Sequence, residues 1–144
     1  MLELRKAVDK DASQLDALDE EIFQTSSYCN YASLVADNNS LIFAAMNGDE
    51  LVGYIYFSKA VDEAELYHIG VKENYREEHI ATDLLEKGIN QLKSEGVKTI
   101  FLEVRHKNKV AISLYVKAGF LKYKVRKDYY GRGADAFCYM MEVK

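Results

Sequence analysis

The hydrophobic pattern of residues 98–118 is the feature that most constrains how this chain folds. Within this stretch the spacing of apolar residues changes once. In 98–105 they occupy alternate positions, which predicts a strand with one apolar face. From Asn108 they recur three or four apart, which predicts a helix over 108–118 that ends at Gly119. The chain must therefore bury one side of a strand and one side of the helix that follows it. The apolar residues of the strand are Ile100, Leu102 and Val104.

One tyrosine lies on the inward side of this predicted helix. The hydroxyl of Tyr115 would be buried there and would need a hydrogen-bond partner or a chemical role. Two interpretations follow: a core tyrosine that donates to a backbone carbonyl, or a proton donor in a reaction. The residues expected to share the inward face are Val110, Ala111, Leu114, Tyr115 and Ala118.

Similar patterns divide the rest of the chain into strands and helices. Apolar runs bounded by turn residues predict six more strands, and helical spacing predicts three more helices. Both faces of the strand over 51–58 are largely apolar, which places it inside a sheet. Since strands and helices are mixed along the chain, we expect one mixed sheet covered by helices. The strands cover 2–7, 40–46, 51–58, 64–71, 121–130 and 134–143, and the helices about 12–22, 31–36 and 78–95.

The composition fits one soluble domain over residues 1–144. Hydrophobic residues make up 49% and charged residues 29%, and no stretch of 18 uncharged apolar residues indicates a membrane span. The N-terminus lacks the apolar core of a signal peptide, so we expect a cytoplasmic protein. Cys29 and Cys138 are too few for a disulfide framework. With the three histidines they show no metal-ligand spacing, so we expect no metal.

Charge is distributed unevenly along the chain. Residues 1–97 have a charge balance of −11 and residues 98–144 one of +7, within a net charge of −4. The basic C-terminal third could face an anionic ligand, and the acidic remainder a cationic one. The overall acidity argues against a general nucleic-acid binder.

Phosphate binding is suggested where a strand passes into a helix at 71–81. A helix N-terminus offers unpaired N–H groups and the positive end of the helix dipole, so it attracts phosphate. Arg76 adds a positive charge there, whereas Glu77 and Glu78 would oppose a pyrophosphate. Many helices begin with a charged turn, so this pattern alone is weak.

Three motifs together resemble the GNAT superfamily of acyl-CoA-dependent N-acetyltransferases. In that family a strand ending in Ile-Ala/Gly-Val precedes Arg-x-x-Gly-x-Gly/Ala at a helix start. Later comes Asn-x-x-Ala/Val-x-x-Leu-Tyr-x-x-x-Gly-Phe. The resemblance implies an α/β (mixed α+β) fold with a mostly antiparallel seven-stranded mixed sheet and helices on both faces. The matching segments here are Ile69-Gly70-Val71, Arg76 to Ala81, and Asn108 to Phe120.

Within the superfamily the chain is most similar to the bacterial ribosomal-protein-alanine N-acetyltransferases. The similarity implies that the acceptor is a protein N-terminal α-amine, such as that of a ribosomal protein. A monomer or homodimer is expected. The chain departs from this branch at 24–27, Gln-Thr-Ser-Ser, where those enzymes usually carry Pro-Trp-Ser near the acceptor site. The residues that carry the similarity are Leu102-Glu103-Val104-Arg105, Asn108, Arg126, Tyr129-Tyr130, Asp135-Ala136 and Met140.

The resemblance also implies how acetyl-CoA would bind. The backbone of Ile69, Gly70 and Val71 would pair with the pantetheine arm like an added strand, and Asn108 would bond the same arm. Since His79 replaces the family's first glycine, a positive φ at this position would cost on the order of 1 kcal/mol. The residues implied around the pyrophosphate are Arg76, Glu77, Glu78, His79, Ile80, Ala81 and Thr82.

The catalytic roles implied by the resemblance fall on one tyrosine and one of two glutamates. Tyr115 would lie close to the thioester sulfur and protonate the departing thiolate. Glu103 matches the general base of the ribosomal branch and is preferred. Glu65 matches the base of histone acetyltransferases and several small-amine enzymes, so both glutamates remain candidates.

Three further side chains accompany these candidates. His68 shares the predicted strand 64–71 with Glu65, but strict alternation would place it on the opposite face. A structural role is therefore expected for His68. In the ribosomal branch Tyr129 and Tyr130 would border the acceptor, although aromatic residues are also common in hairpin strands.

Two other functions remain open from the sequence. One is a GNAT enzyme for a small amine, such as a polyamine, an amino sugar or an amino acid, which would suit the acidic first two thirds. The other is a non-catalytic acyl-CoA-binding module, which Glu77, Glu78 and His79 suggest.

Overall fold

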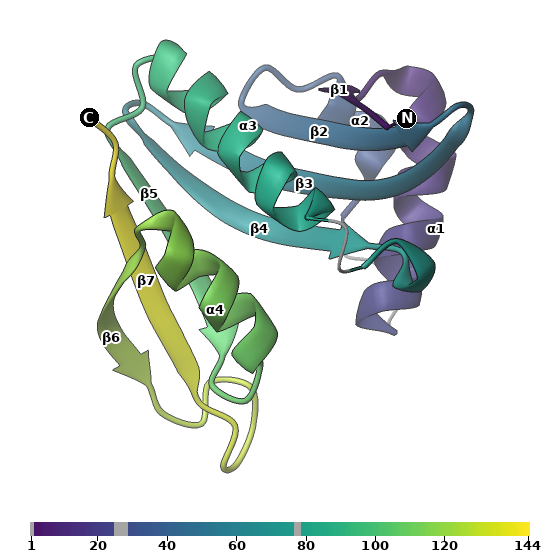
Figure 1. Cartoon of the computed structure of the whole chain (residues 1–144). Coiled ribbons are helices and arrows are strands. Elements are labelled where there is room, and N and C mark those ends of the chain that lie inside the picture. The colour runs from purple at the N-terminus through teal and green to yellow at the C-terminus, as the bar shows by residue number, and fades with distance from the viewer. Residues whose placement is uncertain (1, 25–28, 77–78) are drawn as a thin grey trace.

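The computed structural model describes residues 2–24, 29–76 and 79–144, which form a seven-stranded sheet with helices on both faces (Figure 1). The observed order of strands and helices is the one that the sequence predicts, and the mixed fold is confirmed. The strands are β1 (Glu3–Lys6), β2 (Ser40–Asn47), β3 (Glu50–Ala60), β4 (Glu63–Val71), β5 (Thr99–Arg105), β6 (Leu121–Arg126) and β7 (Ala136–Glu142). The helices are α1 (Ala12–Phe23), α2 (Tyr31–Val35), α3 (Ile80–Ser94) and α4 (Lys109–Ala118), and short 3-10 turns occupy Asp9–Asp11 and Glu73–Tyr75.

The strands are ordered β1-β2-β3-β4-β5-β7-β6 across the sheet. Neighbouring strands run antiparallel except for β4 and β5, which are parallel. A parallel pair needs a crossover connection, and α3 provides it between β4 and β5. The helix packs across β2, β3 and β4 on one face of the sheet (Figure 1).

The alternation of β2 separates two cores, one on each face of the sheet. Leu41, Phe43 and Ala45 belong to a cluster that contains side chains of α3 and α4. Ile42, Ala44 and Met46 belong to a second cluster that contains side chains of α1 and α2. We call these the α3/α4 face and the α1/α2 face.

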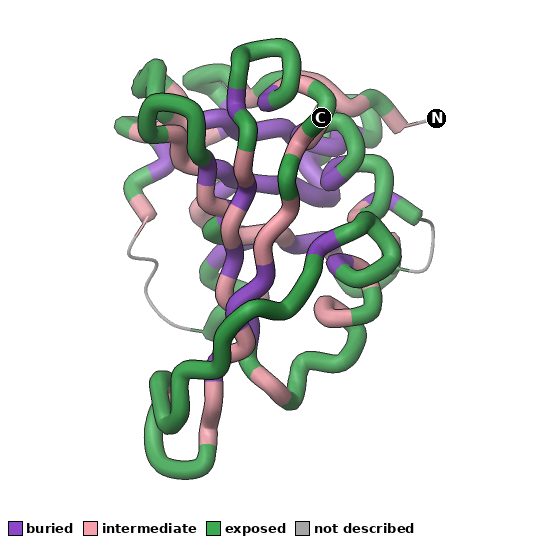
Figure 2. Tube along the Cα trace, turned by 90° about the vertical axis from the view of Figure 1, so that its left-hand side faces the viewer, coloured by how far each residue is buried: buried purple, intermediate pink, exposed green. Residues whose placement is uncertain are grey.

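Strand β3 lies inside the sheet, as its apolar pattern predicts. Its residues 51–57 are buried on both faces. On the α3/α4 face, α3 approaches it closely at Gly88, where an added Cβ would lie 2.3 Å from Cε2 of Phe57. Figure 2 shows the buried residues gathered in the centre of the molecule. In the closing hairpin every residue of β6 is exposed, whereas Ala136, Cys138 and Tyr139 of β7 are buried.

The closing hairpin is shorter than predicted. β6 ends at Arg126 and β7 begins at Ala136, so the strands predicted over 121–130 and 134–143 are too long. Two aspartates stabilise the connection instead: the amide of Gly133 donates to Oδ1 of Asp128 (2.7 Å), and that of Asp128 to Oδ1 of Asp135 (2.9 Å). Tyr129 and Tyr130 therefore lie in a loop, not in a strand.

Helix α4 begins after Asn108, whose Oδ1 accepts from the amide of Ala111 (3.2 Å), and stops at Gly119 with φ 109°. The predicted inward face is correct for Ala111, Leu114 and Tyr115. It is wrong for Val110, which is 85% exposed, and for Ala118, which is also exposed. Val110 lies about 100° around the helix from Ala111, and Ala118 is in the last turn.

Helix α3 starts at Ile80, and the predicted start near Glu78 falls outside the described residues. The helix ends at Ser94, one residue before the predicted end, and Gly96 follows with φ 87°. None of the helices in the described part of the chain is both long and apolar enough to cross a membrane.

Candidate active site

Strands β4 and β5 diverge after a short parallel ladder. Their pairing runs from Glu63 with Thr99 to Leu66 with Leu102. Beyond that point, β5 offers no backbone partner to Ile69, Gly70 or Val71 among the described residues, and Figure 1 shows the two strands separating. The three residues that the sequence assigns to pantetheine therefore have an open backbone edge that faces the gap.

A β-bulge at Tyr67 changes which side chains of β4 face together. Leu66 pairs with Phe57 and His68 pairs with Tyr56, so that Tyr67 is an extra residue in β4. Glu65 pairs with Ser58, two residues from Tyr56, and cross-strand neighbours share a face. The predicted opposite placement of His68 and Glu65 is therefore wrong: both lie on the α1/α2 face.

The two candidate bases lie near each other on this face. Glu103 alternates with the buried residues of β5 and forms an ion pair with Arg126, whose Nε lies 3.2 Å from its Oε1. Glu65 is half-buried on β4. Burial and then the charge of Glu103 raise the pKa of Glu65, and Arg126 lowers it by a smaller amount. The two carboxylates thus share one electrostatic environment but differ in their partners.

Tyr115 lies on the other face of the sheet. It belongs to the cluster of the α3/α4 face, is 6% exposed, and packs edge-on against Phe120 with ring centroids 5.9 Å apart. Burial, with a smaller contribution from Tyr130, raises the pKa of Tyr115 to about 12. A phenol with this pKa keeps its proton at neutral pH and can only donate it.

The predicted acceptor tyrosines stand beside the candidate base. Arg105 lies over the ring of Tyr130, 4.2 Å from its centroid, and Arg126 over the ring of Tyr129 at 5.5 Å. Burial and the charge of Glu103 raise the pKa of Tyr130. Tyr130 also raises the pKa of Tyr115, so it interacts electrostatically with both the predicted acid and the predicted base.

The start of α3 is where the sequence predicts a phosphate site. His79 adopts a left-handed conformation with φ 62°, so this histidine carries the strain that the family's glycine would avoid. Ile80, Ala81 and Thr82 form the first turn, where amides have no partner four residues earlier within the helix. Arg76 Nε donates to the carbonyl of Val71 (3.1 Å). Glu77 and Glu78 lie outside the described residues.

Sequence reasoning missed a polar cluster around Asp19. This side chain is 1% exposed, and its Oδ1 accepts from the hydroxyls of Tyr31 (3.1 Å) and Tyr54 and lies 2.6 Å from Nδ1 of His68. Together with Cys29, Asp19 and His68 place potential metal-ligand atoms within 4.8 Å of one another, a grouping that the spacing of these residues in the sequence does not reveal. With three groups already bonded to Oδ1, the cluster is organised around the carboxylate. The sequence signal that could have revealed this cluster is Asp19 itself, a carboxylate on the apolar face of α1.

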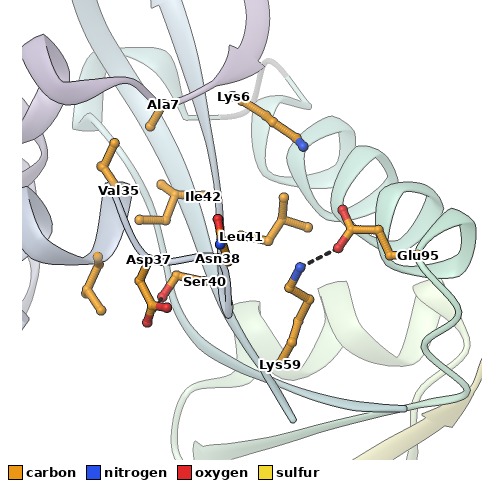
Figure 3. Close-up of a pocket in the computed structure, with 11 residues that line it drawn as sticks. Lys6, Ala7, Val35, Asp37, Asn38, Ser40, Leu41, Ile42, Lys59 and Glu95 are labelled. Carbon is orange, nitrogen blue, oxygen red and sulfur yellow. Dashed lines mark hydrogen bonds and ion pairs between the residues drawn. The ribbon is translucent and has the colours of Figure 1, made fainter. Parts of the chain in front are cut away.

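Two cavities are lined by residues other than the catalytic candidates. One of about 200 Å³ opens among β1, β2 and α2, with Lys59 paired to Glu95 at its side (Figure 3). Of the described residues that line it, none is a predicted site residue. A second cavity of about 630 Å³ borders Arg76 and Glu73 and reaches Ile22 of α1, next to the start of α3.

Comparison with known proteins defines the family. The model of the acetyltransferase (GNAT) family matches residues 5–120, so the chain belongs to this family. The chain is 35% identical over 82 residues to a ribosomal protein bS18-alanine N-acetyltransferase of Haemophilus ducreyi, with 57% of each chain covered. It is 39% identical over 108 residues to an N-alpha-acetyltransferase of Saccharolobus solfataricus, with 66% of this chain and 65% of that one covered.

The matched region spans about three fifths of the length of these curated relatives. A likeness in fold extends further. The crystal structure of Arabidopsis thaliana NAA60 in complex with acetyl-CoA superposes with a TM-score of 0.87, at 18% identity and with 99% of both chains covered.

Proposed function

We propose that this protein is an acetyl-CoA-dependent N-acetyltransferase whose acceptor is the α-amine at a protein N-terminus. Membership of the GNAT family supports the reaction. The names of relatives that act on ribosomal protein bS18-alanine and on N-alpha positions support the acceptor.

The observation that carries the proposal is that the predicted proton donor and the predicted proton acceptors lie on opposite faces of the sheet. Tyr115 belongs to the α3/α4 face, and Glu65 and Glu103 lie on the α1/α2 face, where β4 and β5 part. An acetyl thioester in that gap would meet a buried phenol on one side and carboxylates on the other. This is the arrangement that transfer of an acyl group from sulfur to nitrogen requires.

The residues around the gap fit acetyl-CoA. The open edge of β4 over Ile69–Val71 would bond the pantetheine amides, as an added strand would. Gly70 allows α1 to pack closely on this part of β4, since a Cβ there would lie 2.2 Å from Cδ1 of Ile22. The first-turn amides of α3 and Arg76 would hold the pyrophosphate. Asn108 would bond the pantetheine from its place at the start of α4.

Glu103 is our choice as general base. Its carboxylate forms an ion pair with Arg126, and its charge raises the pKa of Tyr130 at the predicted acceptor border. The reaction forms a C–N bond and breaks the C–S bond of the thioester. Glu103 accepts a proton from the attacking nitrogen, and Tyr115 gives its proton to the thiolate. Glu65 is the alternative base, because a half-buried carboxyl with a raised pKa binds a proton more readily near neutral pH.

Acetyl transfer to defined amines tests the proposal. Purified protein with acetyl-CoA is offered peptides that begin with Ala or Ser, and separately spermidine and free amino acids. We expect turnover on the peptides. Turnover on spermidine or amino acids alone would favour a small-amine enzyme. Acetyl-CoA binding by calorimetry without turnover on any amine would indicate a binding module, and absence of binding at millimolar acetyl-CoA would reject all three.

A further inference from the structure

We propose that His68, oriented by the buried carboxylate of Asp19, is a second proton acceptor of the active site and takes a proton from the substrate's ammonium group before the amine attacks. This inference rests on the proposed function, because it assigns a step in the same reaction.

The β-bulge gives His68 the necessary position. It places the imidazole on the α1/α2 face with Glu65, immediately before the open backbone edge of Ile69–Val71. Without Tyr67 as an extra residue, alternation would direct His68 toward the α3/α4 face. A side chain on the face of the carboxylates and next to the predicted thioester site is placed to meet the acceptor amine.

The hydrogen bonds of Asp19 determine which nitrogen of His68 can accept a proton. Tyr31 and Tyr54 are fully buried, and burial raises the pKa of both hydroxyls, so they remain O–H donors to Oδ1 of Asp19. With Oδ1 acting as acceptor, Nδ1 of His68, 2.6 Å away, must carry the hydrogen of the third bond. We assign from this network the tautomer in which Nε2 holds the lone pair.

The surroundings of the ring hold it in place but leave it accessible. Phe23 stacks on the imidazole with ring centroids 4.3 Å apart. The His68 side chain is 25% exposed, whereas that of Asp19 is 1% exposed. A buried carboxylate that orients a partly exposed imidazole is the arrangement in which histidine acts as a general base. Among the described residues, the titratable groups that face this pair include Cys29 before α2, with Sγ 3.9 Å from Nδ1, Tyr31 of α2, and Tyr54 and Tyr56 of β3.

The proton balance of the reaction has room for two acceptors. A substrate ammonium group loses two protons as it becomes an amide nitrogen. Nε2 of His68 accepts the first and releases it to solvent through its exposed edge. Glu103 accepts the second as the C–N bond forms. Tyr115 donates its proton to the CoA thiolate when the C–S bond breaks, and the Tyr115 phenolate then takes up a proton again.

The experiment measures kcat and kcat/KM from pH 6 to 9 for the full chain and for His68→Asn, with a peptide that begins with Ala. We expect His68→Asn to lower kcat/KM about 100-fold at pH 6.5 and less than about threefold at pH 9, where the α-amine is already neutral. Added imidazole should restore part of the loss in His68→Ala. Long-range nitrogen NMR of the unmodified protein should show the hydrogen of His68 on Nδ1.

Tyr31→Phe is the matched control, since it removes one donor to the same oxygen of Asp19 and leaves the bond to His68. It should lower stability but keep the pH dependence of the parent. A deficit in His68→Asn that is equal at pH 6.5 and 9, or a hydrogen found on Nε2, would overturn the inference while the enzyme remained active. A parent protein that acetylates no amine would instead reject the proposed function, and this inference with it.

Discussion

The two faces of the sheet differ in the chemistry that they bury. The α3/α4 face is an apolar cluster into which the polar ring of Tyr115 is packed. On the α1/α2 face, Asp19 is as completely buried as the leucines beside it and gathers hydroxyl and imidazole groups. Glu65 and Glu103 lie on that same face.

In the proposed mechanism, this difference would separate proton donation on one face from proton acceptance on the other. A phenol in an apolar cluster keeps its proton, because burial disfavours the phenolate. Carboxylates near Arg126 and solvent stay available to accept protons. The reaction would occur where the sheet opens and both faces reach the same atoms. Substitutions on each face therefore test the separation.

The largest expected effect is on the α3/α4 face, from Tyr115→Phe. Since the ring remains to fill its place, the fold should persist while the proton donor is lost. We expect kcat to fall about 100-fold or more with little change in the KM for acetyl-CoA. Tyr139→Phe, which removes a hydroxyl from a tyrosine buried in the same cluster, is the control. Equal turnover in Tyr115→Phe and the parent would break the comparison.

The next effect concerns the carboxylates of the α1/α2 face. Glu103→Gln should lower kcat about 10- to 100-fold if Glu103 is the base. It also removes a negative charge that raises the pKa of Glu65, so that pKa should fall. Arg126→Gln removes a charge that lowers the same pKa, so it should rise. Carbon NMR titration of the Glu65 carboxyl measures both shifts, and a shift of the same sign in both variants would contradict the geometry.

Kinetic measurements can also decide which of the two glutamates is the general base. If Glu65→Gln lowers kcat more than Glu103→Gln does, the base is Glu65. In that case the acid limb of the pH profile of kcat should move to lower pH in Glu103→Gln. The reason is that the negative charge of Glu103 raises the pKa of Glu65, and this pKa falls when the charge is removed. An unmoved limb in Glu103→Gln would exclude Glu65 as the base.

A smaller effect tests the packing of the apolar face. Gly88→Ala should destabilise the protein by about 1–2 kcal/mol, because the clash with Phe57 exceeds the gain of about 1 kcal/mol in helix propensity. Urea unfolding measures the change. Asn90→Ala, at an exposed position of the same helix, should instead add about 0.5 kcal/mol. A gain from both substitutions would show that the contact at Gly88 relaxes freely.

The smallest effect is expected at the start of α3. His79→Gly should stabilise the chain by about 1 kcal/mol, since glycine adopts a φ near 62° without steric cost. Glu86→Gly, in the middle of the same helix, should cost about 1 kcal/mol and is the control. Thermal unfolding of both variants gives the sign, and a loss at His79 would mean that its side chain stabilises the turn.

Much of the fold was predictable from local patterns. The helix over 108–118 was expected from its spacing, and the structure confirms its ends at Asn108 and Gly119. The alternation of β5 identified the side of the strand that carries Glu103. Both are short-range features, because each depends on residues a few positions apart.

The acceptor side was less predictable for a physical reason. The bulge at Tyr67 inserts one residue into β4, and nothing in the sequence of the strand marks it. Strict alternation therefore predicted the wrong face of the sheet for His68. The cluster around Asp19 joins residues from α1, α2, β3 and β4 that only the folded chain brings together. The predicted departure at 25–27 near the acceptor lies outside the described residues.

The short ladder between β4 and β5 has a consequence for the stability of the whole chain. Within the described residues it is the backbone pairing that joins β1–β4 to β5–β7. A bound pantetheine that pairs with Ile69–Val71 would extend the hydrogen bonding of β4 beyond this ladder. We therefore expect it to slow amide hydrogen exchange in both β4 and β5. At a ligand concentration 100 times the dissociation constant, such binding adds about 2.7 kcal/mol to the free energy of unfolding. If the chain binds acetyl-CoA as proposed, the lifetime of the folded protein in a cell would then depend on the supply of acetyl-CoA.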